Sequence, residues 1–332
     1  MVQNRIEYID TLKFLAILGI VFIHVSAIWP NAEVLHLNIR DMTQIFRWGV
    51  PIFIMISGAL LLNREIELTS FFKKRFVRVF YPLLFFIIIT DIIQHYNGFL
   101  NSFWFCWMIL GAYLAIPIIN KFIQHSDEGE LKYYVAVILI SSVIYQVAYS
   151  LNIPFALDIT FFISPVSYLV LGYYLSQKEF KNPVKVILIA ILLFVITTIV
   201  KYHTGSFVHY GDDIFTSVLD ISIVQIVQAS SVFIIVKEIY SFNNQSLFKK
   251  ILGNDIIKNF ILSVSKASYG MYLIQFLYRD YFWSMVSNLT LSGSEVFSCF
   301  ILISILVFFA SWISIWVLGK IPFINKFSGY AG

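Results

Sequence analysis

His24 lies inside a run of about nineteen almost wholly apolar residues, from Leu12 to Pro30. An ionisable side chain in such a run is costly, and in membrane proteins it commonly marks a functional site. A neutral imidazole can take a proton from a hydroxyl group near neutral pH, so His24 is a candidate general base. The alternative is a histidine that bonds to a neighbouring helix for packing alone.

Asp10 and Lys13 precede His24 on the same predicted helix. At about 100° per residue, Lys13 lies within roughly 20° of His24 around the axis, and Asp10 within about 40°. Lys13 and His24 are then about 16 Å apart along the axis. The three side chains therefore share one face and are candidate catalytic residues. Asp10 and Lys13 either pair with each other, or Lys13 meets an anionic cosubstrate.

A second group of charges lies between Phe72 and Pro82, where four cations occur within six residues: Lys73, Lys74, Arg75 and Arg78. Arg75 and Arg78 are three apart, so they share a helix face. Two guanidinium groups in this arrangement suit contacts with phosphate groups. The alternative is an orientation signal that is also attracted to anionic lipid.

Three further residues are candidates for substrate binding. Arg47 begins an apolar segment that contains Pro51 and the small pair Ser57–Gly58; an ordinary role for this arginine is that of a snorkelling anchor. Trp104 opens another apolar segment, where an aromatic belt is the usual explanation. Tyr272 lies in a stretch with small residues, a second tyrosine and a buried amide.

The elements that carry these residues belong to a membrane protein. The chain is 59% hydrophobic and only 13% charged, whereas soluble domains carry about 25% charged residues. The first apolar run is long enough to be a retained helix rather than a signal peptide. Cys106 and Cys299 both lie in apolar runs, so neither a disulfide framework nor a metal site is expected. Membrane lipids are expected partners and nucleic acid is not.

Apolar runs long enough to span a bilayer predict an all-α, polytopic protein with ten transmembrane helices. The runs lie at about 11–30, 44–62, 79–96, 103–123, 133–151, 159–176, 185–202, 218–240, 267–287 and 295–319. Nineteen of the 23 Lys and Arg residues fall in one set of loops and ends; the other set holds Arg40, Arg47, Lys201 and Arg279. The positive-inside rule then puts both termini in the cytoplasm. Residues 1–332 are expected to form a single domain in the plasma (inner) membrane.

The chain resembles the acyltransferase-3 family of integral membrane acyltransferases. The matching motifs occur in family order over nearly the whole chain: Asp10-Thr11-Leu12-Lys13 with His24, Val50 to Gly58, Lys74-Arg75 with Arg78, Trp104-Phe105 with Tyr113 and Pro117, Gly172-Tyr173-Tyr174, and Gly270 to Ile274. The resemblance looks closest to stand-alone surface-glycan O-acetyltransferases, such as the enterobacterial common antigen O-acetyltransferase.

The resemblance implies an acyl group, usually acetyl, that is taken from acyl-CoA at the cytoplasmic side. The acceptor would be a hydroxyl of a cell-surface polysaccharide, as in O-antigen or exopolysaccharide modification, or of a lipid-linked sugar precursor. Acyl-CoA would be a cosubstrate, with no tightly bound cofactor. On this reading His24 is the base, Arg75 and Arg78 meet the CoA phosphates, and Arg47 and Tyr272 position the substrate or stabilise an oxyanion.

The chain departs from the family pattern at three positions. Lys13 stands where the family has arginine, which keeps the charge and loses the planar fork. Phe103 and Gln275 stand where the family often has histidine, and glutamine cannot titrate. Two other functions therefore stay open. One is a transporter or flippase for a glycolipid or small solute, and the other is a catalytically inactive relative.

Overall fold

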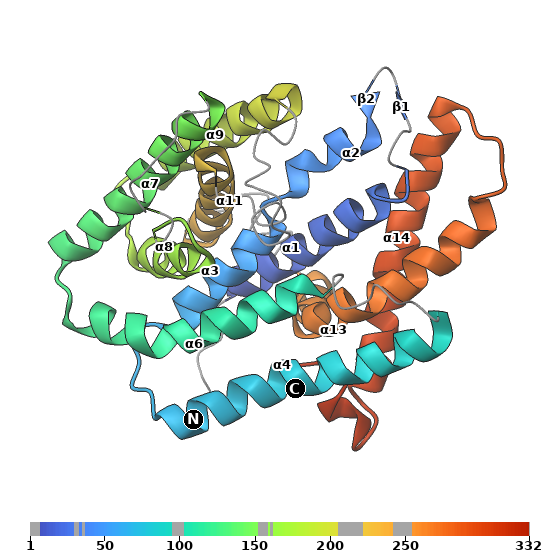
Figure 1. Ribbon diagram of the computed structural model, residues 1–332, viewed down its shortest axis with the longest axis horizontal. Coiled ribbons are helices and arrows are strands. Elements are labelled where there is room, and N and C mark those ends of the chain that lie inside the picture. Colours follow the sequence, from blue (N-terminus) through green and yellow to red (C-terminus); the bar gives the residue numbers. More distant parts are fainter. Residues whose placement is uncertain are drawn as a thin grey trace. The chain divides into compact units, whose positions relative to one another are not determined.

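The computed structural model describes residues 7–29, 33–34, 37–94, 103–151, 159, 162–204, 222–241 and 254–331. These residues are almost all helical (Figure 1), which confirms the predicted all-α class. Within them, the β-structure consists of one antiparallel pair of two-residue strands, β1 (Glu33–Val34) and β2 (Leu37–Asn38). The helices are α1 (Glu7–Ser26), α2 (Ile39–Met42), η1 (Thr43–Phe46), α3 (Gly49–Leu61), α4 (Leu68–Gln94), α6 (Trp104–His125), α7 (Glu128–Ser150), α8 (Pro165–Gln177), α9 (Pro183–Thr204), α11 (Ile223–Ser241), α13 (Asp255–Val286), α14 (Gly293–Leu318) and η3 (Ile324–Lys326).

Eight helical segments in the described part are long and apolar enough to cross a membrane: Glu7–Ser26, Thr43–Leu61, Leu68–Ile93, Trp104–His125, Glu128–Ala148, Pro183–His203, Ile223–Ser241 and Gly293–Leu318. They coincide with eight of the ten predicted runs, although parts of some runs, such as 218–221, lie outside the described residues.

The other two predicted runs fall on α8 and α13. The 13 residues of α8 are fewer than the roughly 20 that a span needs. Helix α13 has 32 residues, but charged side chains interrupt its apolar sequence. The count of ten therefore stays a prediction.

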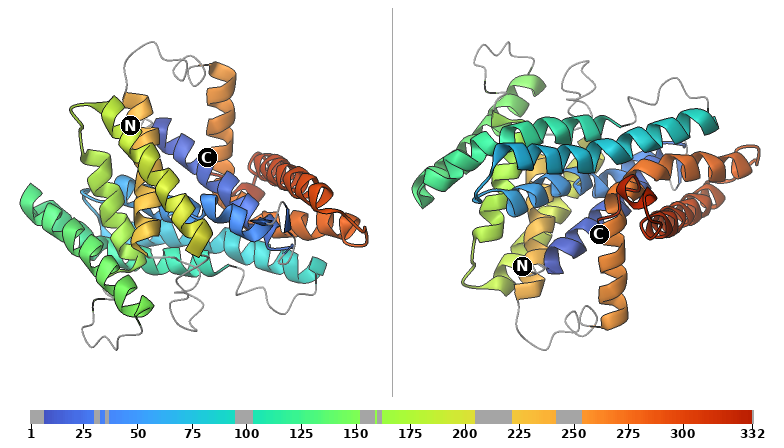
Figure 2. Two further views of the ribbon diagram at one scale, coloured as in Figure 1. Left: turned by 90° about the horizontal axis from the view of Figure 1, so that it is seen from above. Right: turned by 90° about the horizontal axis from the view of Figure 1, so that it is seen from below.

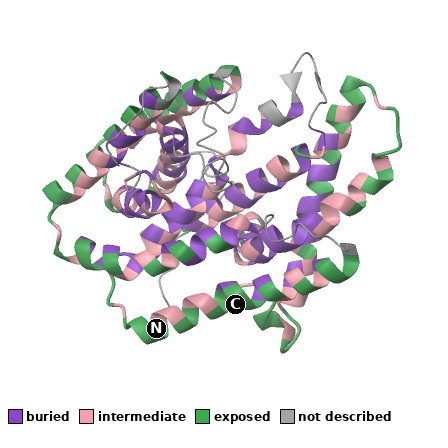
Figure 3. Ribbon diagram, in the orientation of Figure 1, coloured by how far each residue is buried: buried purple, intermediate pink, exposed green. Residues whose placement is uncertain are grey.

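The surface of these helices is the kind that lipid covers. On α9, Leu188, Leu192 and Ile199 expose more than half of their surface, and α9 is largely exposed in Figure 3, whereas much of α1 is buried. Soluble proteins rarely expose apolar faces of this length to water.

The chain folds into two compact units. Unit 1 comprises Met1–Gly49, Lys73–Cys106 and Gln245–Gly332, and unit 2 comprises Val50–Phe72 and Trp107–Asn244. All the predicted site residues belong to unit 1. The single domain predicted for residues 1–332 is a separate question and stays a prediction.

In unit 1, α1 and α13 pack side by side and run in the same direction. Near their N-terminal ends, the Lys258 ammonium pairs with the Glu7 carboxylate. Near their other ends, the rings of Trp29, just after α1, and Trp283, in the last turn of α13, meet edge to face with centroids 5.0 Å apart. The two first turns therefore lie at one end of the unit. In the predicted topology, Lys258 belongs to the larger set of basic residues, so this end of unit 1 would be the cytoplasmic one.

Helix α14 packs against the same pair and runs in the opposite direction to α1. The Phe14 ring meets Phe308 at 6.0 Å, and the Phe22 ring meets Phe300 at 5.7 Å. Positions ascend along α1 as they descend along α14. The C-terminal end of α14 therefore lies at the end of the unit where α1 begins.

Helix α13 changes direction near its middle, as both views of Figure 2 show. That region holds Ser268 and Gly270, residue types at which helices bend. The segment after α14 folds back onto this place: the backbone N–H of Ala331 donates to the Lys266 carbonyl at 2.8 Å. A Cβ on Gly270 would overlap the carbonyl oxygen of Ser328, so glycine is what allows the segment to approach.

Unit 2 is held together in part by the close approach of α3 and α8. A Cβ on Gly58 would overlap the backbone of Leu169, and a Cβ on Gly172 would overlap the backbone of Met55. Small residues permit such contacts between membrane helices. Gly58, from the small pair Ser57–Gly58, thus lies at one of these contacts.

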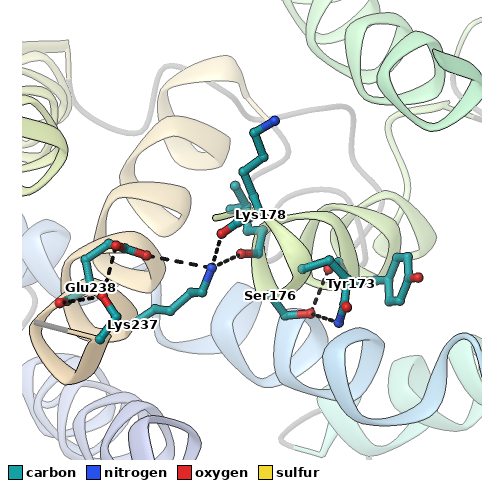
Figure 4. Close-up of polar contacts among 8 residues, drawn as sticks. Tyr173, Ser176, Lys178, Lys237 and Glu238 are labelled. Carbon is teal, nitrogen blue, oxygen red and sulfur yellow. Dashed lines mark hydrogen bonds and ion pairs between the residues drawn. The ribbon is translucent and has the colours of Figure 1, made fainter. Parts of the chain in front are cut away.

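The C-terminal end of α8 is capped by a cation from α11 (Figure 4). The Lys237 ammonium donates to the Leu175 carbonyl at 3.0 Å and to the Lys178 carbonyl. Its charge is balanced by the buried Glu238, whose Oε1 lies 3.7 Å away. The last carbonyls of a helix lack intrahelical partners and carry the negative end of the dipole, so this ammonium satisfies both needs.

Candidate active site

Asp10, Lys13 and His24 all lie on α1, which is helical without interruption from Glu7 to Ser26. Their predicted common face follows from this regular helix. The Asp10 carboxylate accepts a hydrogen bond from the Ser265 hydroxyl of α13 at 2.5 Å. Asp10 therefore ties α1 to α13, in addition to any interaction with Lys13 on its own helix.

The imidazole of His24 faces the same helix, α13. Its ring centroid lies 4.8 Å from that of Phe276 and 6.2 Å from that of Tyr272. The amide of Gln275 is close enough to interact with the imidazole. The structure thus brings His24 and Tyr272 together, as the prediction of a shared site requires.

One nitrogen of His24 is buried and has no hydrogen-bond acceptor or donor in the described part of the chain. This atom is Nδ1, and the Oε1 atom of Gln275 is in the same condition. A histidine kept for packing would use its nitrogens in bonds to neighbouring helices, because unpaired buried polar atoms cost free energy. The Nδ1 nitrogen is therefore left for a reacting group, while the Gln275 amide lies near the same ring, and the catalytic role of His24 stays a prediction.

Two arginines supply the charges that act on this imidazole, namely Arg279 and Arg47. The sequence marks Arg279 only as one of the four basic residues in the smaller set of loops. Arg47 was predicted, and its position follows from a break in the chain between η1 and α3. Pro51 cannot donate to the carbonyl four residues earlier, which belongs to Arg47, and its ring would clash there. A new helix therefore starts at Gly49, and Arg47 ends the preceding 3-10 turn.

Aromatic rings complete the surroundings of Tyr272. The Phe105 ring lies 5.3 Å from the Tyr272 ring, and the Phe103 ring lies 6.2 Å away. Trp104 is turned differently: it is half-buried and meets Phe105 edge to face. The aromatic segment therefore contributes to the site through the two phenylalanines, and a substrate-binding role for Trp104 stays a prediction.

Arg75 and Arg78 lie on α4, three residues apart in a regular helix. Arg78 is exposed and Arg75 is half-buried. Arg78 shares its helix face with Tyr81 and Phe85, whose rings pack on Phe327 at 5.8 and 6.0 Å. The shared face is as predicted, and the face continues into an apolar contact with the segment that follows α14. The assignment of both arginines to CoA phosphates stays a prediction.

Phe276 and Arg279 are the site residues that the sequence did not single out. The signal was their spacing, because residues 272, 276 and 279 recur on one helix face. This spacing has meaning only once α13 is known to face His24. The pattern within α13 does not indicate which distant helix that face contacts.

Comparison with known proteins adds one positive result. A family model described as an acyltransferase domain, of the type-3 class, matches residues 6–317. No curated protein and no solved structure matches the chain.

Proposed function

The chain belongs to the acyltransferase-3 family, and we propose that it is an O-acyltransferase of cell-surface glycans. Family membership makes it a membrane acyltransferase. The proposal adds the donor, acyl-CoA, with acetyl as the expected acyl group. It also adds the acceptor, a hydroxyl of a polysaccharide or lipid-linked sugar precursor at the plasma membrane. The specific likeness to the enterobacterial common antigen O-acetyltransferase is part of the same proposal.

The observation that carries the proposal is the buried, unpartnered nitrogen of His24 beside Tyr272 and two arginines. In the proposed reaction, the imidazole takes the proton of the acceptor hydroxyl as its oxygen attacks the thioester carbonyl. The tetrahedral oxyanion is stabilised by a nearby donor, for which Arg47 and Tyr272 are the candidates. Collapse of this intermediate breaks the carbon–sulfur bond, and the imidazolium returns its proton to the CoA thiolate.

The donor would reach His24 from the end of unit 1 where α1 begins. Lys13 lies at that end, about 16 Å from His24 along the helix. Arg75 and Arg78 would hold the CoA phosphates, since paired guanidinium groups bind phosphate bidentately. Direct transfer and a route through an acyl group carried on His24 both fit this arrangement.

The test is the acyl content of the surface glycan in cells that carry His24→Ala or His24→Gln. Loss of a general base typically lowers a rate by a factor of about 10²–10⁴, so acylation should fall to background. His125→Ala is the matched control, because His125 is exposed on α6 and its ring bonds to the Lys121 carbonyl of its own helix. Full acylation by His24→Ala at normal protein levels would contradict the mechanism.

A binding measurement separates the enzyme from a transporter. Acetyl-CoA should raise the melting temperature of the purified protein, and Arg75→Gln with Arg78→Gln should weaken this shift. A transporter of glycolipids has no reason to bind acetyl-CoA. No shift at saturating acetyl-CoA would favour the transporter.

A further inference from the structure

Arg279 lies next to the site, against the Phe276 ring. Its guanidinium carbon lies 5.1 Å from the centroid of the Phe276 ring, and that ring lies 4.8 Å from the His24 imidazole. A cation over an aromatic face is attracted by the ring quadrupole. The Phe276 ring thus contacts both the imidazole and the guanidinium.

The guanidinium is fixed at one edge and available at the other. Its Nε donates to the Asp280 carboxylate at 2.6 Å. The other four N–H groups of an arginine have no acceptor within the part of the chain that the structure describes, and the side chain is 24% exposed. Arg279 therefore offers a preorganised fork of donors, the geometry that binds carboxylate and phosphate bidentately.

The position of Arg279 along the helices indicates which substrate it meets. Helices α1 and α13 run in parallel, and α13 faces Asp10 through Ser265 and His24 through Phe276. Arg279 lies further on, so it is on the other side of His24 from Lys13. The CoA phosphates are proposed to lie on the Lys13 side. The anion that Arg279 would bind then belongs to the acceptor.

We propose that Arg279 is an acceptor-binding residue that takes an anionic group of the glycan, so that the preferred acceptor is an acidic saccharide rather than a neutral one. The anion is either a carboxylate or a phosphate group that the glycan carries; the same guanidinium edge would bind both. Arg47 adds a second positive charge near His24 and favours the same class. This inference rests on the proposed acyltransferase function.

The experiment uses the full-length protein in lipid nanodiscs with acetyl-CoA. The acceptor is de-O-acylated surface glycan from the producing cell in three forms: native, carboxyl-reduced and dephosphorylated. The wild-type protein should lose about tenfold to a hundredfold in kcat/KM on one of the two neutralised forms, as expected for a lost charge-assisted bond. The form that loses activity identifies the anion. This comparison needs no variant.

Variants then assign the effect to Arg279. Arg279→Gln should show a similar loss on native glycan, chiefly as a higher KM, and should equal the wild type on the neutralised form. Arg279→Lys should recover part of the activity. Arg64→Gln is the matched control, because Arg64 is exposed in unit 2 and bonds through its backbone.

Two outcomes would overturn the inference, and they differ in what else they contradict. If the wild type acylates all three glycans equally well, or Arg279→Gln discriminates as the wild type does, the inference is wrong and the acyltransferase function stands. If the wild type acylates none of them, the proposed function itself fails, and the inference fails with it.

Discussion

Asp10 links α1 to α13, the helix that faces His24, through a side-chain hydrogen bond. The Ser265 hydroxyl donates to its carboxylate at 2.5 Å, and Ser265 is itself buried. Hydrogen bonds to a charged partner are worth more than neutral ones. Asp10 therefore contributes to the site by fixing the packing of α1 on α13, as well as through any part it has in the chemistry.

Ser265→Ala removes this bond and leaves the Asp10 carboxylate without the hydroxyl. We expect the free energy of unfolding to fall by about 1–3 kcal/mol, measured by denaturation of the purified protein in mixed micelles. Ser298→Ala is the control, since Ser298 is exposed and its hydroxyl donates to the Ser294 carbonyl of its own helix. Equal stability of the two variants would show that the Asp10 bond contributes nothing.

At the residue scale, the sequence predicted what lies within one helix. The common face of Asp10, Lys13 and His24 follows from the helical period alone. The contacts of Phe276 with His24 and Arg279 could not be predicted, because they depend on how α1 packs against a helix far along the chain. Proximity in space, rather than residue type, distinguishes Arg279 from the other basic residues.

At the scale of elements, close helix contacts depend on two glycines. Gly58 and Gly172 lie on α3 and α8, and each faces the backbone of the other helix. Backbone cannot move aside as a flexible side chain can. A methyl group at either position therefore has to push the two helices apart.

Gly58→Ala and Gly172→Ala should each destabilise the protein by about 1–3 kcal/mol or more, and should reduce the yield of folded protein. Gly111→Ala is the matched control, because a Cβ on Gly111 meets nothing within 4 Å. This control should be neutral or more stable by up to about 1 kcal/mol, since alanine favours a helix. Thermal unfolding of the three variants compares them directly, and similar melting temperatures would refute the close contact.

Hydropathy predicted most of the long helices, because burial in lipid demands long apolar runs. It could not predict the break before α3, where Pro51 denies a bond to the Arg47 carbonyl. Nor could it fix the extent of α13, which starts at Asp255 rather than at the predicted residue 267. Lys258 and Ser265 in that extra length pair with Glu7 and Asp10 of α1, and such pairing offsets the low hydropathy.

At the scale of the whole molecule, the directions of three helices in unit 1 bear on the topology. Helix α14 is antiparallel to α1, so the start of the first helix and the end of the last lie at one end of the unit. If both helices cross the membrane, the number of crossings is even. The predicted ten crossings and the eight candidate spans both satisfy this condition.

Cysteine labelling tests this arrangement in a Cys106→Ser, Cys299→Ser background. Glu7→Cys and Lys320→Cys should react with a membrane-impermeant maleimide only in inverted vesicles, because the positive-inside rule puts that end in the cytoplasm. Asn288→Cys, in the turn between α13 and α14, should react in intact cells. Labelling of residues 7 and 320 from opposite sides would contradict the even number of crossings. Labelling of both from outside would contradict the orientation alone.

The pairing of α1 with α13 can form only late in biosynthesis, after α13 has been synthesised. Ser265 follows Asp10 by 255 residues, and ribosomes add about 5–20 residues per second. The first helix must therefore wait in the membrane for on the order of ten seconds or longer before its partner exists. During that interval the Asp10 carboxylate lacks the Ser265 hydroxyl, and the His24 imidazole lacks its contact with Phe276. A nascent chain of this protein consequently has a long period in which its first span is poorly matched to lipid, and in which membrane quality control can recognise it.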